Sequence, residues 1–485
     1  NLGHLLQSSF CLEEAFICYS RVLGLKPTPA DSIPENFHAT VNHYIANVLK
    51  AQGKMREANK HYRQALALNP AMPGVHSDML LALNYDPPDP NEVFSEHMEW
   101  SRRHAYTGPA AYQHKQSRDP ERTMRIGYLS PDLYHHAVTF FFEPLISKCD
   151  RSRFETVCYS ARQKSDHVTT RLRSLSTLWR EVFAMNDKQV ADQIYADQID
   201  ILVDLTGHMG ENRLPVFSRK PAPIQISWLG YPNTTGLSAI DYRLTDATAD
   251  PPGLTDRYYT ERLFRLPRGF LCYRPSETAP GVGPLPAATS DSVTFGSFNN
   301  LSKITPGTIE LWSTILHGVS NSRLVLKNAS FTDISTRQPY YQAFERFGIG
   351  RDRIDFRGLS LDLADHQSVY NEIDVALDPF PYNGATTTCE SLWMGVPVIT
   401  LAGKWHAGRV GASILTQAGL TELIGSSFED YVRIAVELAN DPARLSEWRR
   451  TLRARMEASP LCDEKAFARA VEEAYRTMWK SWCES

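Results

Sequence analysis

The sequence predicts an α-helical repeat region followed by two Rossmann-like α/β halves. Three observations support this: a repeated helix-pair pattern near the start, an alternation of short apolar runs with helical stretches from Arg125, and a Pro/Gly/Ser-rich segment between two such sets. At about 150 residues per domain, 485 residues suit about three domains. We place repeats at 1–70, linking helices at 71–118, an N-terminal half at 119–290 and a C-terminal half with C-terminal helices at 291–485.

Composition excludes several classes of protein. The chain has 51 Lys+Arg against 55 Asp+Glu, and 11% aromatic residues, so it is not a disordered chain. No run approaches the ~18 apolar residues of a membrane span, and the net charge of −4 disfavours an overall basic nucleic-acid binder. The eight cysteines form no C-x-x-C pair and no zinc-ligand spacing. We therefore expect free thiols and a cytoplasmic protein, also nuclear if eukaryotic, with no membrane or nucleic-acid partner.

The first segment shows one pattern twice, in residues 1–27 and 42–70, at the offsets of a tetratricopeptide repeat. Small residues let paired helices approach closely, an aromatic fills the gap, and a proline ends the unit. The closing prolines lie at 27 and 70, which is the 34-residue period plus nine, and the extra nine fit a Pro-rich insertion around Pro29 to Phe37. The matching positions are Leu2, Gly3, Leu6, Ala15, Tyr19, Val22 and Pro27, then Ile45, Ala46, Leu49, Ala58, Tyr62, Ala65 and Pro70.

A single helix pair cannot bury its own apolar face, so repeats must stack. We expect the chain to be the C-terminal part of a longer array, or a short array braced on the next domain; a plain helical hairpin is the alternative. Residues 71–118 are predicted to be linking helices. In Glu92–His104, the residues Val93, Phe94, Met98 and Trp100 are expected on one apolar face.

From Arg125 the alternation predicts two parallel sheets with crossover helices. Strands are predicted at Arg125–Leu129, Glu155–Tyr159, Ile199–Leu205 and Ile224–Leu229, then at Ser292–Phe298, Arg323–Lys327, Arg353–Phe356, Asp374–Leu377 and Val396–Leu401. Helices are predicted near Thr139–Lys148, His167–Ser174, Lys188–Ala196, Thr308–Leu316, Arg337–Phe347, His366–Glu372, Thr388–Met394 and Arg409–Gln417, with a helical tail from Phe428 broken near Pro460.

Two doubly wound halves facing a cleft form a GT-B arrangement, which many nucleotide-sugar transferases share. A dehydrogenase could also hold two such halves. No predicted strand is followed by G-x-G-x-x-G, which disfavours dinucleotide binding.

The segment Asp378–Ser391 has the features of a phosphate site. A buried strand ends at Asp378, a Pro- and Gly-bearing loop follows, and a helix starts at Thr386, Thr387 and Thr388. Free N–H groups at a helix start, beside threonine hydroxyls, suit a diphosphate. Glu390, one turn inside, could accept hydrogen bonds from ribose hydroxyls. An ordinary threonine N-cap with an acidic first turn is the alternative.

Lys303 follows the first strand of the same half, at the strand end where open α/β sheets bind ligands. A solvated lysine is the alternative, but a lysine beside a phosphate-binding helix could neutralise a leaving diphosphate. In the first half, His136 and His208 each follow a strand, and Gly230–Gly236 ends another strand on the same edge. Taken singly, each histidine also fits a structural role.

Together these motifs resemble the SPINDLY and O-GlcNAc transferase family, in which tetratricopeptide repeats precede a split GT-B catalytic region. The resemblance covers nearly the whole chain. It is tightest in Arg125–Asp132, Asp204–Arg213, Pro221–Asp246, Thr294–Pro306 and Asp378–Gly403.

The resemblance implies transfer of a sugar from a nucleotide donor to Ser/Thr of proteins, with inversion and without a metal. It implies that Lys303 contacts the donor phosphates beside Asn300, that His366 lies against the base, that Thr386–Thr388 hold the diphosphate and that Glu390 binds ribose. His136 and His208 match two active-site histidines, and either could be the general base. Protein acceptors would bind through the repeats, and a longer array could mediate a homodimer.

The resemblance also bears on the donor. O-GlcNAc transferases carry His-Thr-Thr and Asp where this chain has Ala385–Glu390, and Arg where it has Val369. The run Thr386–Ser391, Phe298–Lys303, and Gly230–Gly236 followed by Asp241–Tyr242 and Ala249–Pro252 look like SPINDLY instead. The donor of SPINDLY is GDP-fucose, so we expect an O-fucosyltransferase. UDP-GlcNAc is the alternative donor. A non-catalytic repeat scaffold, and a transferase acting on glycans or small molecules, are the rival functions.

Overall fold

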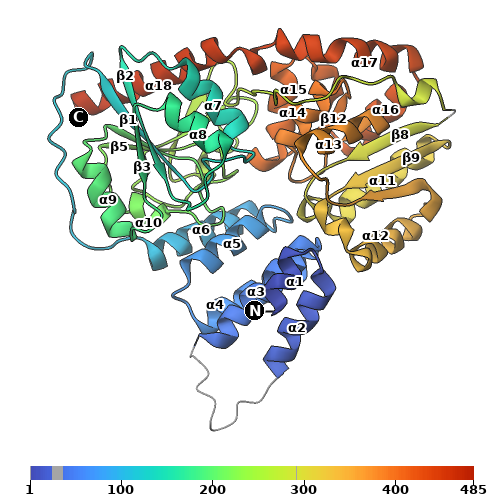
Figure 1. The fold of residues 1–485 in the computed structure, drawn as a ribbon, viewed down its shortest axis with the longest axis horizontal. Helices are drawn as coiled ribbons and strands as arrows, with labels where there is room; N and C mark the ends of the chain where they lie inside the picture. The colour runs from blue at the N-terminus through green and yellow to red at the C-terminus, as the bar shows by residue number, and fades with distance from the viewer. Residues whose placement is uncertain (1, 25–35, 291) are drawn as a thin grey trace. The chain divides into compact units, whose positions relative to one another are not determined.

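The computed structural model describes residues 2–24, 36–290 and 292–485 (Figure 1). Pro27 and residues 29–35 of the predicted insertion lie outside the described residues. Contacts within the chain define two units. The first holds the chain up to Pro87 together with Pro275–Met456, and the second holds Pro88–Arg274 and Glu457–Ser485.

The first unit begins with paired helices, as the repeat pattern predicts. The elements are α1 (Leu2–Ser8), α2 (Leu12–Gly24), α3 (Phe37–Ala51), α4 (Met55–Leu68) and α5 (Pro73–Leu83). Ala46, Ala58 and Ala65 are fully buried where helices approach, and Gly3 lies against the ring of Tyr19. Small residues therefore set the helix spacing here.

The turn between α3 and α4 packs against the α/β part of the same unit. Gly53 has a φ of +79°, and a side chain there would clash with the Tyr340 hydroxyl and lie 3.0 Å from the Leu301 carbonyl oxygen. Tyr340, in α12 (Ile334–Arg346), donates to the Gln52 carbonyl at 3.3 Å. The helical segment is thus docked on the second half of the chain.

The sheet of the first unit has six parallel strands in the order β10-β9-β8-β11-β12-β13. The strands are β8 (Val293–Ser297), β9 (Ser322–Lys327), β10 (Ile354–Arg357), β11 (Val375–Leu377), β12 (Val398–Leu401) and β13 (Ile424–Gly425). The helices are α11 (Pro306–Gly318), α12, α13 (Leu363–Ser368), α14 (Thr386–Trp393), α15 (Val410–Gln417), α16 (Phe428–Ala439) and α17 (Pro442–Glu457). The strand order reverses between β8 and β11, which is the position where such sheets bind ligands.

The sheet of the second unit has seven parallel strands in the order β3-β2-β1-β4-β5-β6-β7. The strands are β1 (Met124–Ser130), β2 (Phe154–Ser160), β3 (Leu178–Glu181), β4 (Ile201–Asp204), β5 (Ile224–Ser227), β6 (Tyr242–Asp246) and β7 (Arg262–Leu266). The helices are α6 (Pro90–His104), α7 (Thr139–Lys148), α8 (His167–Leu175), α9 (Asp187–Ala196), α10 (Leu214–Phe217) and α18 (Glu464–Glu484). Here the order reverses between β1 and β4.

Every predicted strand is present, but β3, β6, β7 and β13 were not predicted. The segments of β3 and β7, LWRE and RLFRL, have half-exposed side chains and no continuous apolar run. β6 alternates apolar and polar residues, and β13 has two residues. Three of the four missed strands, β3, β7 and β13, are edge strands, and the fourth, β6, lies inside its sheet but lacks a continuous apolar run.

The buried face of α6 differs from the predicted one. Val93, His97 and Trp100 are buried, whereas Met98 is 39% exposed. A histidine takes the position expected for an apolar residue because both of its ring nitrogens have partners. Nδ1 lies 2.7 Å from the Val93 carbonyl oxygen and Nε2 lies 2.8 Å from the Tyr231 hydroxyl.

The C-terminal tail also departs from the predicted boundary. It is helical from Phe428, with breaks after α16 as well as near Pro460. Helix α18 packs on α7 and on the strands β5 and β7, so it belongs with the N-terminal half rather than with residues 291–456 (Figure 1). Arg274 joins it there, because its guanidinium bonds Glu464 at 2.6 Å and Glu143 of α7 at 2.8 Å.

Two further expectations concern the whole chain. The eight cysteines all lie within the described residues and carry free thiols. Within the described ranges, no helix is both long enough and apolar enough to cross a membrane.

Candidate active site

Lys303 lies at the point where the strand order of the first unit reverses. It is the last residue of the short helix η3 (Leu301–Lys303), which follows β8. Its ammonium donates to the Asn383 carbonyl at 2.7 Å and lies 4.3 Å from the centre of the Tyr382 ring. Both of these residues belong to the loop after β11, so Lys303 bridges the two central strand ends.

The environment of Lys303 is unusual for a lysine. Burial lowers its pKa to about 8, and the nearby Asp378 carboxylate opposes this shift. Burial also raises the pKa of Asp378, against hydrogen bonds from the Thr400 hydroxyl and the Gly384 N–H, each 2.7 Å long. Lys303 is thus a cation partly shielded from water, next to a carboxyl group with a raised pKa. Such a cation attracts an anion more strongly than a fully solvated lysine does.

The start of α14 offers backbone donors to the same region. Ala385 is the N-cap and makes no side-chain cap, so the first N–H groups, those of Thr386, Thr387 and Thr388, lack intrahelical partners. Gly384 keeps the approach open: a side chain there would lie 2.6 Å from the Thr387 hydroxyl and 2.8 Å from that of Thr388. The predicted phosphate-binding helix start is therefore present and uncapped.

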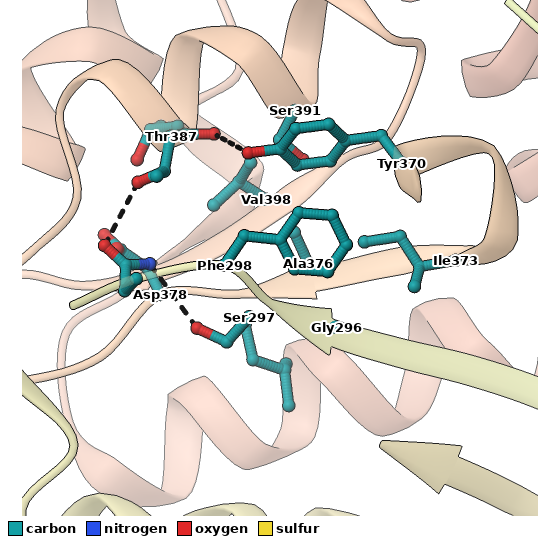
Figure 2. Close-up of a pocket in the computed structure, with 13 residues that line it drawn as sticks. Gly296, Ser297, Phe298, Tyr370, Ile373, Ala376, Asp378, Thr387, Ser391 and Val398 are labelled. Carbon is teal, nitrogen blue, oxygen red and sulfur yellow. Dashed lines mark hydrogen bonds between the residues drawn. The ribbon is translucent and has the colours of Figure 1, made fainter. Parts of the chain in front are cut away.

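The three threonines do not share one role. Thr386 and Thr387 are half-buried, and the Thr387 hydroxyl donates to the Asn299 side-chain oxygen at 3.0 Å. Thr388 is buried, and its hydroxyl oxygen has no hydrogen-bond partner among the described residues. A cavity of about 10 Å³, near the minimum for one water, lies under the helix start (Figure 2), and Thr388 is among the residues that line it.

Figure 2 shows residues that line this cavity. The rings of Phe298 and Tyr370 lie 4.4 Å apart between centroids, and the Tyr370 hydroxyl donates to the Thr387 carbonyl at 3.3 Å. Asn299, which sequence analysis missed, is buried and also donates to the Ser297 hydroxyl at 3.4 Å. Asn300, which was predicted, is exposed, and its side chain caps η3 by accepting from the Ser302 N–H at 3.3 Å.

Glu390 and His366 form a second group of polar side chains beside the start of α14. Glu390 is buried, and its carboxylate lies 3.4 Å from His366 Nε2 and accepts from the Tyr370 hydroxyl at 3.4 Å. Lys327, at the end of β9, lies 2.7 Å from His366 Nδ1. An ammonium can only donate, so Nδ1 accepts and Nε2 carries the proton that faces Glu390.

Lys327 was another residue that sequence analysis missed. It is the last residue of a predicted strand and sits at the same strand-end edge as Lys303. That position was its only signal in the sequence. Burial lowers its pKa, and the acidic groups of Asp365 and Glu390 oppose that shift.

The second unit positions His136 and His208 after β1 and β4, the two strands at its own reversal point. The hydroxyls of Ser130 and Thr206 join these strand ends at 3.0 Å. His136 is 28% exposed, and its Nδ1 lies 3.8 Å from the Asp132 carboxylate. Burial lowers the pKa of His136, against the attraction of Asp132, so the neutral ring is favoured at pH 7.

His208 has a different setting, because it is fully buried. Its Nε2 lies 2.9 Å from the Thr235 carbonyl oxygen, and the Trp100, Tyr231 and His97 rings surround it at 4.8–5.4 Å. The predicted Gly230–Gly236 segment does reach His208, through Tyr231 and Thr235. This packing fixes the ring and gives it the contacts of a structural histidine.

The described residues hold no group of three His, Cys, Asp or Glu side chains arranged to bind a metal ion. Lys303 and the uncapped start of α14 could hold an anion, beside the Glu390 carboxylate and the His366 imidazole. Such a set suits a nucleoside diphosphate.

Comparison with known proteins agrees with this arrangement. Residues 76–274 and 285–471 match the model of glycosyl transferase family 41, and the chain belongs to that family. A solved structure, an O-GlcNAc transferase mutant from Thermobaculum terrenum, superposes with a TM-score of 0.92 at 37% identity, covering 100% of this chain and 90% of that one. The predicted fold class is thereby confirmed.

Two Arabidopsis thaliana relatives differ in their similarity to this chain. The chain is 43% identical, over 86% of its length, to an Arabidopsis thaliana protein named probable UDP-N-acetylglucosamine–peptide N-acetylglucosaminyltransferase SPINDLY. It is 31% identical, over 78% of its length, to the Arabidopsis protein with the same enzyme name followed by SEC. The chain covers 46% of the SPINDLY protein and 39% of SEC, so it spans less than half the length of these relatives.

Proposed function

We propose that this chain transfers a sugar from a nucleoside diphosphate donor to Ser/Thr hydroxyls of proteins, with inversion and without a metal. The observation that carries the proposal is the pairing of Lys303 with the uncapped start of α14 at the reversal point of the sheet. The peptide N-acetylglucosaminyltransferase names of the relatives support the reaction class.

Each residue of the site has a role in this reaction. The first N–H groups of α14 bind the donor diphosphate, and Lys303 stabilises the negative charge that grows on it as the bond to the sugar breaks. Glu390 accepts hydrogen bonds from ribose hydroxyls. Lys327 and Glu390 hold the His366 ring between them, so that its face can lie against the base.

The acceptor hydroxyl attacks the anomeric carbon from the side opposite the diphosphate, which inverts the centre. Its proton must pass to a base or to water. Of the two predicted histidines, His136 suits a base better, because its lowered pKa keeps it neutral at pH 7 and it is partly exposed. His208, fully buried, suits a positioning role.

We favour GDP-fucose as the donor, because Thr386–Ser391, Phe298–Lys303 and Gly230–Gly236 look like SPINDLY. UDP-GlcNAc is the second candidate, since the names of the relatives specify it. Protein acceptors would bind through the repeats, in the cytoplasm. The rival proposal is a scaffold with an inactive site. It conflicts with the presence of Lys303, Gly384 and Glu390 together at the start of α14.

The test is transfer of labelled fucose from GDP-fucose, and of labelled GlcNAc from UDP-GlcNAc, to proteins of a lysate. It is paired with calorimetry of GDP and UDP binding. Transfer from GDP-fucose with preference for GDP supports the favoured donor, and the reverse pattern assigns UDP-GlcNAc. Nucleotide binding without transfer from either donor would refute the proposed transferase activity. Binding of neither nucleotide would favour the scaffold.

A further inference from the structure

A stack of side chains joins the helical segment to the lysine of the active site. Tyr85 lies just after α5 and is buried. Its ring stacks on the ring of Tyr382, with centroids 4.9 Å apart and planes at 26°. The Tyr382 ring in turn holds the Lys303 ammonium 4.3 Å from its centre. All three residues belong to the first unit.

The Tyr382 ring and the Asn383 carbonyl oxygen, the latter at 2.7 Å, both contact the Lys303 ammonium. A cation over an aromatic face at this distance is attracted to it, and the attraction has a preferred direction. Tyr382 itself lies in the loop between β11 and α14, outside any helix or strand. The orientation of its ring therefore depends on what packs against it, and Tyr85 does so.

Tyr85 is well suited to act as such a support. Burial raises the pKa of its hydroxyl, so the ring stays neutral at physiological pH. Behind it, the helices α3 and α5 are joined by an ion pair, with Lys50 Nζ 3.4 Å from Asp78 Oδ1. His43 also lies 2.8 Å from the Asp78 carboxylate. The support is thus part of a fixed polar cluster in the helical segment.

A second contact holds the backbone next to Lys303. The Ser302 hydroxyl donates to the Lys50 carbonyl at 2.9 Å, so the end of α3 fixes η3 one residue before the lysine. The helical segment therefore contacts both the backbone that carries Lys303 and the ring on which its ammonium lies.

We propose that Tyr85 is a positioning residue for the donor site, which orients Lys303 through the Tyr382 ring. Helix α3 of the repeats and the end of the linking helix α5 are then part of the donor site, in addition to any role of the repeats in acceptor binding. This inference rests on the proposed function only in assigning Lys303 to the donor diphosphate.

The test is calorimetry of the full chain with whichever of GDP and UDP the wild type binds, from pH 7 to pH 10. Tyr85→Leu removes the aromatic support, and Tyr85→Phe keeps it. Tyr19→Leu is the matched control, because Tyr19 is an equally buried tyrosine of the helical segment that packs on Gly3 and Tyr44. Should Tyr85→Leu not fold, judged by its melting transition, Tyr85→Met takes its place.

Tyr85→Leu should weaken nucleotide binding at pH 7 by about 2- to 30-fold, the range of a cation–aromatic contact. Tyr85→Phe and Tyr19→Leu should bind within about 2-fold of the wild type. The pH profile gives a second readout. A loosened Tyr382 admits water to Lys303, whose lowered pKa then rises, so the alkaline loss of affinity moves to higher pH. Asp378 is the charged group that faces Lys303, and none of these variants changes it.

Three outcomes would overturn the proposal: wild-type affinity in Tyr85→Leu, an unmoved alkaline limb in that variant, or equal weakening in Tyr19→Leu. A wild type that binds neither nucleotide would instead refute the proposed function, because the assignment of Lys303 to a diphosphate would then fail before any variant is compared.

Discussion

Replacing Lys303 by methionine removes the ammonium that lies over the Tyr382 ring while keeping an unbranched apolar side chain. A hydrogen bond to a charged group contributes about 1.5–3 kcal/mol, so affinity for the nucleoside diphosphate should fall about 10- to 150-fold. The charge on the leaving diphosphate grows as the sugar bond breaks. The loss in kcat should therefore be larger than that of an ordinary binding contact, about 100- to 1,000-fold.

The fold should tolerate this change. Lys303 is the cation that offsets the buried Asp378 carboxylate, whose pKa burial already raises. Without the lysine this pKa rises further, and Asp378 takes up a proton instead of remaining a buried, unpaired charge. Its hydrogen bonds with Thr400 and Gly384 remain available. We expect the melting temperature at pH 7 to change by only a few degrees.

The assay is steady-state sugar transfer at saturating donor, with calorimetry of the nucleotide and a melting curve for each variant. Lys465→Met is the matched control, because Lys465 is an exposed lysine of α18 in the other unit. A Lys303→Met enzyme whose kcat stays within about 5-fold of the wild type would refute the role of this lysine at the diphosphate.

Three further predictions follow from the same structure. Gly384→Ala should place a methyl group among the hydroxyls of Thr387 and Thr388 and lower nucleotide affinity at least about 10-fold. Gly74→Ala is the control: Gly74 has open space around it, so this change should leave the affinity unaltered. In the wild type, nucleotide affinity should be highest well below pH 8 and should fall as pH rises through the lowered pKa of Lys303, about 8. Calorimetry that finds this fall in affinity only near pH 10.5 would contradict the prediction. Arg274→Met should leave the buried Glu143 without one of its partners. The free energy of unfolding should fall by about 2 kcal/mol and the melting temperature by several degrees. The loss is smaller than for a fully buried ion pair because the arginine is 25% exposed.

Sequence patterns predicted the central strands of both sheets because these strands are buried on both faces and appear as continuous apolar runs. They did not predict β7, an edge strand in which Arg262 and Arg265 interrupt the apolar residues. The packing of α18 on the N-terminal half was also beyond sequence analysis. An amphipathic helix shows that it has a buried face, but its pattern does not name the sheet that covers that face.

The site was predictable where chemistry is local in sequence. The uncapped helix start and Lys303 each follow a predicted strand, so the rule for parallel sheets brings them together. Asn299 and Lys327 were missed because their roles depend on contacts with α14 and α13, which lie far along the chain. Asn300 and Asn299 are neighbours, and only the structure shows which of them turns inward.

The return of α18 to the N-terminal half has a consequence for biosynthesis. The seven strands of that half are complete at Leu266, yet the helix that covers α7, β5 and β7 begins only at Glu464, so it leaves the ribosome long after them. Until then the apolar surface under Phe467, Val471 and Met478, all buried in the finished fold, stays open to water and to other chains. A nascent or C-terminally shortened chain should therefore depend on chaperones at its N-terminal half, far in sequence from the missing residues.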